Sequence, residues 1–535
     1  ITKTNPSSEC CSGEIELDQS LTSISESAFR DCIGLIGSLI IPNTVISIGI
    51  NAFNGCNGLT GDLILPNSVT TIGSGAFKSC SGFNGTLTLP NALTKIETAV
   101  FYSCSGFTGS IILPNTLTSL GAASFMGCSG FTGNLNIPNG VVTISSQTFQ
   151  SCSGLNGVLI IPNSVISMGD SAFRYCDGFN GDLTLPSSIL SIGNSCFDQC
   201  SGFNGTLSLG NGLQTIGTYA FNGCSGFVGT ITLPTSLVFI GGYAFERCSG
   251  LTGSLDIPST VVSLETAVFG RCSGLNGTLT IPSTITAIGA SAFGHTGFIG
   301  TLVLPPNLTT IGDSAFHSCS GFTGPLVLPE TLVNIKAVAF QGCSGFTGSL
   351  IIPNSVISMG DGAFKDCDGF NGHLSLPNNL TTIPPFAFVD CRGLSGVLTI
   401  PNSVVNINEY AFNNCRNLDG ELMIPSTVTN IGHAGFNNCI NIGSIRMYDH
   451  TTYESNTFSG SVVPIILTNI PTSMPTTLPT SQPTSDISFK KHFKDEVEGV
   501  ASNVKDYLIE ARGGIRNAIK KFKLAIQPPG YKEDF

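Results

Sequence analysis

The sequence predicts an α/β-type solenoid, a stack of short strands and single helical or 3₁₀ turns, followed by a Pro/Thr/Ser-rich linker and a C-terminal amphipathic helix. Three observations predict this fold class. A phenylalanine recurs eighteen times from Phe29 to Phe436, almost always 24 residues apart. Glycine, proline and cysteine keep the same register, and charged residues make up only 10% of the 535 residues. A fixed period of this length indicates small units that bury their apolar residues by stacking.

One unit, residues 57–80, shows how the elements follow from the residues (NGLTGDLILPNSVTTIGSGAFKSC). Leu63 and Leu65 alternate with Asp62 and Ile64, which is the period of a short strand with one inward face. Pro66 lacks a backbone N–H and therefore ends that strand. The segment 68–73 (SVTTIG) predicts a second short extended segment. The segment 74–80 (SGAFKSC) has the spacing of a single helical or 3₁₀ turn, too short to be stable alone.

The register of the repeat is almost unbroken. A cysteine follows the phenylalanine by three residues in every unit except the twelfth, which reads AFGHTGF and is one residue short. A glycine recurs from Gly37 to Gly420, and a proline recurs from Pro42 to Pro425 with Gly210 as the single substitution. About seven inward side chains per unit, each contributing roughly 1.5–3 kcal/mol on burial, should form one continuous core.

These residues resemble a known family. Residues 63–80, LILPNSVTTIGSGAFKSC, are similar to the BspA-like (Treponema-type) leucine-rich repeat, whose pattern is I-x-I-P-x-x-V-x-x-I-G-x-x-A-F-x-x-C. The similarity covers roughly residues 13–458. One departure is an extra residue in GFxGxL, which makes the unit 24 residues long instead of 23. The resemblance implies a leucine-rich-repeat solenoid used on cell surfaces for adhesion or recognition, and it names no ligand.

The sequence divides into four predicted parts. Residues 1–12 are expected to form an N-terminal cap segment, and residues 13–458 a leucine-rich-repeat solenoid of about 18 units with a terminal cap. Residues 459–485 form a Pro/Thr/Ser-rich linker whose end reads IPTSMPTTLPTSQPTS. Such a stretch cannot build a core and predicts an extended spacer. Residues 486–535 are expected to form an amphipathic helical tail.

The tail carries a candidate attachment helix. Its apolar residues fall at steps of three and four, which marks one face of a helix. Such a face should meet a partner helix or a membrane surface, with packing back onto the solenoid as the alternative. The residues of this face are Phe489, Phe493, Val497, Val500, Val504, Leu508, Ile515, Ile519, Phe522 and Ile526.

Seventeen of the 20 cysteines occupy the repeat position after phenylalanine. A metal site is not expected, because no repeat contains C-x-x-C and no histidine accompanies the column at ligand spacing. Parallel side chains in a ladder rarely meet the geometry of a disulfide. We therefore predict that most of these thiols are reduced and buried as small apolar side chains. Cys10 and Cys11 precede the first full unit and are candidates for a cap disulfide.

No constellation of catalytic residues is visible, so the sequence predicts that the protein is not an enzyme and needs no cofactor. The six histidines are scattered, with His295 and His317 interpreted as rim side chains. Asp and Glu occupy no consistent inner-face position, and neither a phosphate-binding loop nor a nucleophile elbow is present. A net charge of −12 argues against a nucleic-acid partner. No run of eighteen apolar residues occurs.

One outward column of the second extended segment is a candidate ligand-facing ladder. Small hydroxyl residues dominate it, and they could contact a glycan, a wall polymer or ice; the alternative is that hydroxyl residues simply suit exposed strands. Lys95, Ala287 and Asn334 share the column, and Phe239 with Val238 forms an apolar spot in it. The ladder comprises Ser47, Thr71, Ser119, Thr143, Ser167, Ser191, Thr215, Phe239, Ser263, Thr310, Ser358 and Thr382.

Five N-x-S/T sequons permit glycosylation in a secreted eukaryotic protein. They begin at Asn84, Asn204, Asn276, Asn307 and Asn379.

These observations favour a non-enzymatic recognition or adhesion protein, secreted or held at a cell surface through its C-terminal helix. Its expected partners are a protein or glycan ligand on the solenoid and a partner helix or membrane surface at the tail. The first alternative is a structural subunit of an extracellular or virion assembly, since a low-charge, uniform surface suits lateral contacts. A second alternative is an intracellular signalling scaffold.

Overall fold

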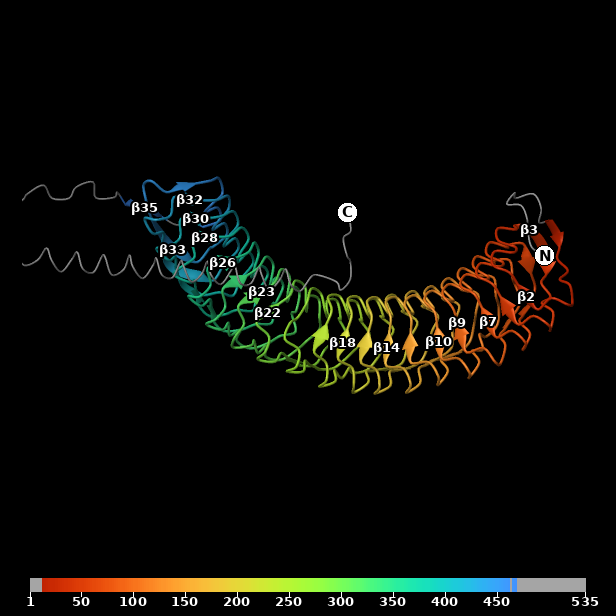
Figure 1. Ribbon diagram of the computed structural model, residues 1–535. Helices are drawn as coiled ribbons and strands as arrows, with labels where there is room; N and C mark the ends of the chain where they lie inside the picture. Colours follow the sequence, from red (N-terminus) through yellow and green to blue (C-terminus); the bar gives the residue numbers. More distant parts are fainter. Residues whose placement is uncertain (1–11, 462–463, 469–535) are drawn as a thin grey trace, which may run out of the picture. The chain divides into compact units, whose positions relative to one another are not determined.

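The computed structural model describes residues 12–461 and 464–468, all within the first of two compact units, Ile1–Ile470. These residues form a solenoid of 35 short strands in two ladders of parallel pairs (Figure 1). In this part of the chain there is no helix, and hence no segment long and apolar enough to cross a membrane as one. The linker beyond residue 468 and the candidate attachment helix lie outside the described residues.

The first ladder is built from the segment that ends at the repeated proline. Its strands pair in parallel with their counterparts in the neighbouring repeats, as Leu63 does with Leu87. Its last strand lies in the segment that the sequence assigns to the linker. The strands are β1 (Ser12–Glu14), β3 (Gly34–Ser38), β5 (Leu59–Thr60), β6 (Leu63–Ile64), β8 (Leu87–Thr88), β11 (Leu135–Asn136), β13 (Leu159–Ile160), β15 (Leu183–Thr184), β17 (Leu207–Ser208), β20 (Leu255–Asp256), β21 (Leu279–Thr280), β25 (Leu350–Ile351), β27 (Leu374–Ser375), β29 (Gly396–Thr399), β31 (Leu418–Met423), β33 (Ile442–Tyr448) and β35 (Ile465–Thr468).

The second ladder is built from the segment that follows the proline, and its strands also stand side by side in register (Figure 1). They are β2 (Ser23–Ile24), β4 (Ser47–Ile48), β7 (Thr71–Ile72), β9 (Lys95–Ile96), β10 (Ser119–Leu120), β12 (Thr143–Ile144), β14 (Ser167–Met168), β16 (Ser191–Ile192), β18 (Thr215–Ile216), β19 (Phe239–Ile240), β22 (Ala287–Ile288), β23 (Thr310–Ile311), β24 (Asn334–Ile335), β26 (Ser358–Met359), β28 (Thr382–Ile383), β30 (Asn406–Ile407), β32 (Asn430–Ile431) and β34 (Thr452–Tyr453).

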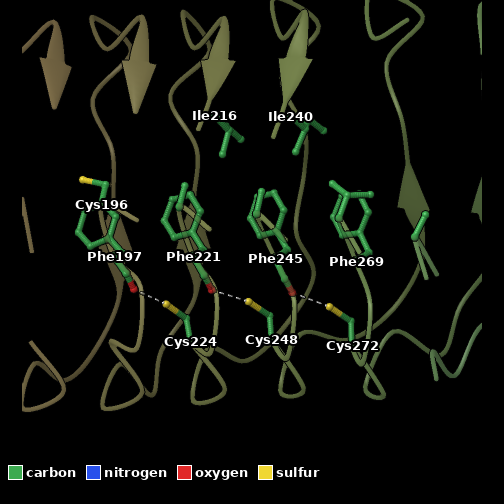
Figure 2. Close-up of a cluster of buried hydrophobic side chains, with 14 of the residues drawn as sticks. Cys196, Phe197, Ile216, Phe221, Cys224, Ile240, Phe245, Cys248, Phe269 and Cys272 are labelled. Carbon is green, nitrogen blue, oxygen red and sulfur yellow. Dashed lines mark hydrogen bonds between the residues drawn. The ribbon is translucent and has the colours of Figure 1, made fainter. Parts of the chain in front are cut away.

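The predicted core is confirmed. In the repeat at residues 57–80, Leu63, Leu65 and Ile72 are buried, whereas Ile64 and Thr71 point outward. The repeated phenylalanines stack face to face through the centre of the solenoid, with ring centroids 5.3 Å apart for Phe221 and its successor (Figure 2). Offset stacking of this kind adds to the apolar burial of each ring. The core therefore continues from one repeat to the next without a boundary.

The helical or 3₁₀ turn predicted around each phenylalanine is wrong. In the described residues this segment is a chain of tight turns, because the residues two before and two after the phenylalanine adopt left-handed backbone angles. Tyr219 and Gly223 flank Phe221 with φ of 59° and 71°. The amide of Phe221 donates to Ala244 O of the next repeat at 2.8 Å, while Asn222 N closes a turn to Tyr219 O at 3.1 Å. Alternate amides therefore bond along the solenoid axis, which a helix would prevent.

The left-handed residues predict a stabilising substitution. Val338 has a φ of 49° although it is β-branched, whereas Gly75 and Gly362 occupy the equivalent position in other repeats. A left-handed non-glycine residue costs about 1–2 kcal/mol, and a glycine returns part of this by its greater freedom when unfolded. Val338→Gly should therefore raise the free energy of unfolding by about 0.5–1 kcal/mol in a denaturant titration. The control is Val333→Gly, a half-buried valine without left-handed angles, which should be destabilising; equal losses would contradict the prediction.

The cysteines form a second axial ladder, which we call the thiol column. From Cys56 to Cys439, each thiol of the column donates to the phenylalanine carbonyl of the preceding repeat at 2.9–3.1 Å. Figure 2 shows three of these bonds, from Cys224, Cys248 and Cys272. The thiols from Cys80 to Cys439 and that of Cys196 are free and buried, as predicted, and Cys56 is buried as well. The sequence suggested apolar filling alone; the structure adds a directed hydrogen bond.

The short twelfth repeat keeps this architecture with one change. Thr296 occupies the cysteine position and is buried, so the deleted residue is the one that follows the cysteine in the other units. Its hydroxyl donates to Phe293 O of its own repeat at 2.7 Å. The carbonyl of Phe269 consequently receives no thiol, and the rings of Phe269 and Phe293 are 6.2 Å apart, against 5.2 Å for Phe245 and Phe269. Repeat twelve is therefore held less closely to repeat eleven.

Candidate functional site

The candidate ligand-facing ladder lies on the outer side of the second ladder. The register places its members next to one another along the axis, as in the pairs Ser47–Thr71, Thr143–Ser167 and Thr215–Phe239. All twelve side chains are exposed or half-buried. Neighbouring hydroxyls are close enough to bond, as Thr143 and Ser167 do at 3.2 Å. The sequence therefore placed these side chains on the correct face; that they bind a ligand remains a prediction.

Glycine is the commonest residue directly beside this ladder, one position beyond the buried residue of the second ladder, as at Gly169, Gly193, Gly217 and Gly241 of four consecutive repeats. Other repeats carry a side chain there, at Glu97, Ser145, Glu265, Lys336, Pro384 and Asn408. A Cβ on Gly193 would lie 2.6 Å from the backbone N of Asp170, and one on Gly217 would lie 2.6 Å from the backbone N of Asn194. Such approaches are closer than van der Waals contact, so a side chain at either of these two positions would require the neighbouring backbone to shift. The missing side chains leave a depression along each run of glycines, which we call the ladder groove.

The opposite bank of the ladder groove is formed by the residue that follows each glycine. Asp170 Oδ1 accepts a hydrogen bond from Asn194 N at 2.7 Å, and Asn194 Oδ1 accepts one from Thr218 N at 2.9 Å. These bonds fix both side chains. The second polar atom of each, Asp170 Oδ2 and Asn194 Nδ2, has no partner among the described residues. The sequence analysis missed this bank, although its position next to the repeated glycine was a usable signal.

The ladder groove widens at two places. One segment, of about 370 Å³, lies between Asp170 and Asn194 on one bank and Ser191, Thr215 and Phe239 on the other. The Phe239 side chain is 41% exposed, which is unusual for a phenylalanine in this chain, where most are fully buried. This segment therefore combines an aromatic face, hydroxyls, a carboxylate and an amide within a few repeats.

The second segment, of about 540 Å³, lies nearer the N-terminus. Ser47, Thr71 and Lys95 line it from the ladder, and Ser74 lines it from the opposite bank. Glu97 occupies the glycine position between them. Its charged pair of opposite sign gives it a different character from the segment beside Phe239. The ladder groove therefore keeps a similar backbone from repeat to repeat, while the side chains that line it differ.

The sequons are accessible. All five asparagines are exposed. Three of them use the side-chain oxygen to accept a backbone N–H of the preceding repeat, as Asn84 does from Gly61 at 2.8 Å. The Asn379 amide donates to Asn354 O at 3.0 Å, a bond that an attached glycan would disturb. Glycosylation itself remains a prediction.

Cys10 and Cys11 lie outside the described residues, so the predicted cap disulfide remains a prediction. Cys32, the first member of the thiol column, is disulfide-bonded.

Two of the scattered histidines meet in the folded chain. His295 and His317 come from repeats twelve and thirteen, and their facing nitrogens are 3.1 Å apart. Burial, followed by the neighbouring His295, lowers the pKa of His317. Within residues 12–461 and 464–468, no group of three or more His, Cys, Asp or Glu could hold a metal ion. The sequence analysis described the histidines as scattered and missed this pair.

The repeats match a described protein family. The family model "BspA type Leucine rich repeat region (6 copies)" matches residues 7–132, 84–204, 131–252, 204–323 and 323–397, so that its matches together span residues 7–397. No curated protein matches the chain.

Several solved structures are similar to it. A leucine-rich repeat protein from Bacteroides ovatus is 23% identical, covering 84% of this chain and 97% of its own, with a TM-score of 0.41. A leucine rich cell surface protein from Faecalibacterium prausnitzii is 25% identical, covering 56% of this chain and 86% of its own, with a TM-score of 0.39. The pneumococcal vaccine antigen PcpA is 16% identical, covering 72% of this chain and 86% of its own, with a TM-score of 0.38.

Proposed function

Because the chain belongs to the BspA-type leucine-rich repeat family, we propose that it is a non-enzymatic recognition or adhesion protein that binds an extended protein or glycan ligand in its ladder groove. The observation that carries this proposal is the segment beside Phe239. There an exposed aromatic ring faces Asp170 and Asn194 across a glycine floor. Aromatic faces with a few fixed polar groups are the usual composition of binding sites.

We further propose that the protein acts outside the cell or at a cell surface, attached through residues 486–535. The disulfide at Cys32 supports this placement, because disulfides persist mainly in oxidising compartments. The exposed sequons agree with it. A particle surface is the alternative location. We propose that the tail binds either a membrane surface or a partner helix.

The binding proposal predicts the effect of one substitution. Phe239→Ser replaces the aromatic ring with a hydroxyl side chain, the kind found at most other positions of the ladder. We expect at least about a tenfold loss of affinity for the ligand found by screening the full chain against glycans and matrix proteins, equivalent to about 1.4 kcal/mol. The melting temperature should be unchanged, because the ring is already 41% exposed.

Val327→Ser is the matched control, since Val327 is 68% exposed and points outward from the first ladder. It should leave ligand binding unchanged. Equal loss in both variants, or hydrolysis of a screened polymer by the wild-type chain, would refute recognition at the groove.

A structural subunit of an assembly is the second candidate function. It is favoured by the outward side chains of the first ladder at Val303, Val327 and Ile351, which are 67%, 68% and 53% exposed in three consecutive repeats. Neighbouring apolar side chains of this kind can form lateral contacts. Sedimentation of the full chain separates the two functions: concentration-dependent polymers support the assembly, and a monomer that binds a ligand supports recognition.

A further inference from the structure

The histidine pair joins two repeats on the side of the solenoid formed by the tight turns around the repeated phenylalanines, which we call the turn edge. His295 is the left-handed residue two positions after Phe293, with a φ of 59°. His317 directly follows Phe316 in the next repeat. His295 Nε2 and His317 Nδ1 are 3.1 Å apart. The same two positions are adjacent in the full-length repeats, because the backbone N–H of the second residue after each phenylalanine donates to the carbonyl of the first residue after the next one, as His295 N does to His317 O at 2.7 Å.

The distance between the two nitrogens fits two ligands of one metal ion. Zn²⁺ binds imidazole nitrogen at about 2.0–2.1 Å, so two ligands on it are about 2.9 Å apart at a right angle and about 3.4 Å apart in a tetrahedron. The observed 3.1 Å lies between these values.

The ring orientation agrees with this distance. The ring centres are 4.7 Å apart and the ring planes are inclined by 68°. In a straight N–H···N hydrogen bond, the centres would be separated by about 5.4 Å, the N···N distance plus two ring radii. The shorter separation shows that the axes from the ring centres through the facing nitrogens are not collinear, and it agrees with two axes that meet at one metal ion in front of both rings.

The surroundings hold the pair and leave room for further ligands. Ser318 Oγ lies 3.3 Å from His317 Nδ1, on the same side as His295. The Gln341 side chain forms a hydrogen bond with His317 and donates to Asp366 Oδ2 at 3.3 Å. Outer partners of this kind fix the orientation of a metal-binding imidazole. Arg271 and Asp366 are the charged groups acting on His317, and their charges oppose each other.

We propose that His295 and His317 form a surface site for a divalent transition metal of the imidazole-binding class, such as Zn²⁺, Ni²⁺ or Cu²⁺, with water completing the coordination. Two protein donors make the site open and exchangeable, unlike a structural zinc site with four. The metal would link repeat twelve to repeat thirteen. Repeat twelve is the unit that lacks the thiol bond to the repeat before it, so the site lies where the stack has lost another axial contact.

Equilibrium dialysis of the full chain against Zn²⁺ and Ni²⁺ tests the site. The wild-type chain should bind one metal equivalent more than His295→Ala, His317→Ala or the double variant. His373→Ala is the matched control, because His373 is exposed and its side chain bonds to Ser349. This variant should retain the full stoichiometry. Equal metal binding by wild type and the double variant would overturn the proposal.

A second measurement on the unmodified chain avoids dependence on variant folding. Diethyl pyrocarbonate modification of both imidazoles, mapped by peptide mass spectrometry, should be slowed at least about tenfold by Zn²⁺, while modification of His373 should not change. Hydrogen exchange of the turn-edge amides of repeat twelve should slow in parallel. Modification of all three histidines at rates independent of Zn²⁺ would equally overturn the proposal.

Discussion

Raising the pH from about 8 to about 10.5 is expected to lower the melting temperature of the solenoid steeply, because the unfolded chain then ionises thiols that the folded chain keeps protonated. Burial raises the pKa of Cys104, Cys152 and Cys272 from 9.0 to about 12. It likewise raises the pKa of Cys319 to about 11. Removal of the thiol proton would also delete the hydrogen bond to the phenylalanine carbonyl.

Stability decreases as pH rises because the pKa of these thiols is higher in the folded state than in the unfolded state. Below pH 9.0 the thiols are protonated in both states, and their full contribution to stability is present. Between pH 9 and about 12 the unfolded state releases protons that the folded state retains, so stability falls as pH rises. Each such thiol removes about 1.4 kcal/mol per pH unit. A cooperative block of five repeats would therefore lose about 7 kcal/mol per unit.

Thermal unfolding followed by circular dichroism at a series of pH values measures this loss, and thiolate absorbance of the native chain shows whether the thiols remain protonated. The matched control replaces Cys224, Cys248 and Cys272 with Ala together. Its stability at pH 7 should be lower, but its loss of stability per pH unit should be smaller by about 4 kcal/mol. Native thiols that ionise with a midpoint near 9 would contradict the prediction.

Gly226→Ala is expected to destabilise the solenoid by about 4 kcal/mol or more, the range of the most severe single substitutions. A Cβ at Gly226 would lie 2.2 Å from Phe203 O and 2.5 Å from Ser201 O of the preceding repeat. Both obstacles are backbone atoms held by the stack, so neither can move without separating two repeats. The damage should spread to neighbouring repeats, because each repeat is stabilised by those beside it.

Gly348→Ala is the matched control for this substitution. Gly348 has a φ of 81°, and no atom lies within 4 Å of the position of its Cβ. Only backbone strain is added there, about 1–2 kcal/mol. Both variants replace glycine with alanine, and they differ in the atoms that surround the new Cβ. The difference in their free energies of unfolding, measured by urea titration, therefore reports the cost of the close approach between repeats. A Gly226→Ala chain as stable as Gly348→Ala would show that the repeats can move apart at little cost.

The strands and the core could be predicted because they follow from local alternation. Leu63, Leu65 and Ile72 define their inward faces without reference to any other repeat. The turn around Phe221 could not be predicted in this way. Its backbone angles are set by bonds to residues 23 positions later, and a window of seven residues cannot distinguish them from a helical turn.

One side of the candidate site could be predicted from the sequence, and the other side could not. The outward hydroxyls of the ladder follow from strand alternation, whereas the far bank at Asp170 and Asn194 depends on how closely glycine lets two repeats approach. The pair His295 and His317 required knowing which positions of neighbouring turns are adjacent, and this is set by the bond from His295 N to His317 O. A missing residue in repeat twelve was visible in the sequence, but its place after Thr296 became clear only from the thiol column.

The axial bonds of the turn edge also make that edge electrically polar. In every repeat the amides of this edge, such as those of Tyr219, Phe221 and Gly223, donate toward the following repeat, so their dipoles add instead of cancelling. As in a helix, aligned peptide dipoles leave partial charges at the two ends. Here donors remain at the C-terminal end of the edge and acceptors at the N-terminal end. The turn edges of two solenoids that meet end to end would therefore attract in head-to-tail order and repel in head-to-head or tail-to-tail order.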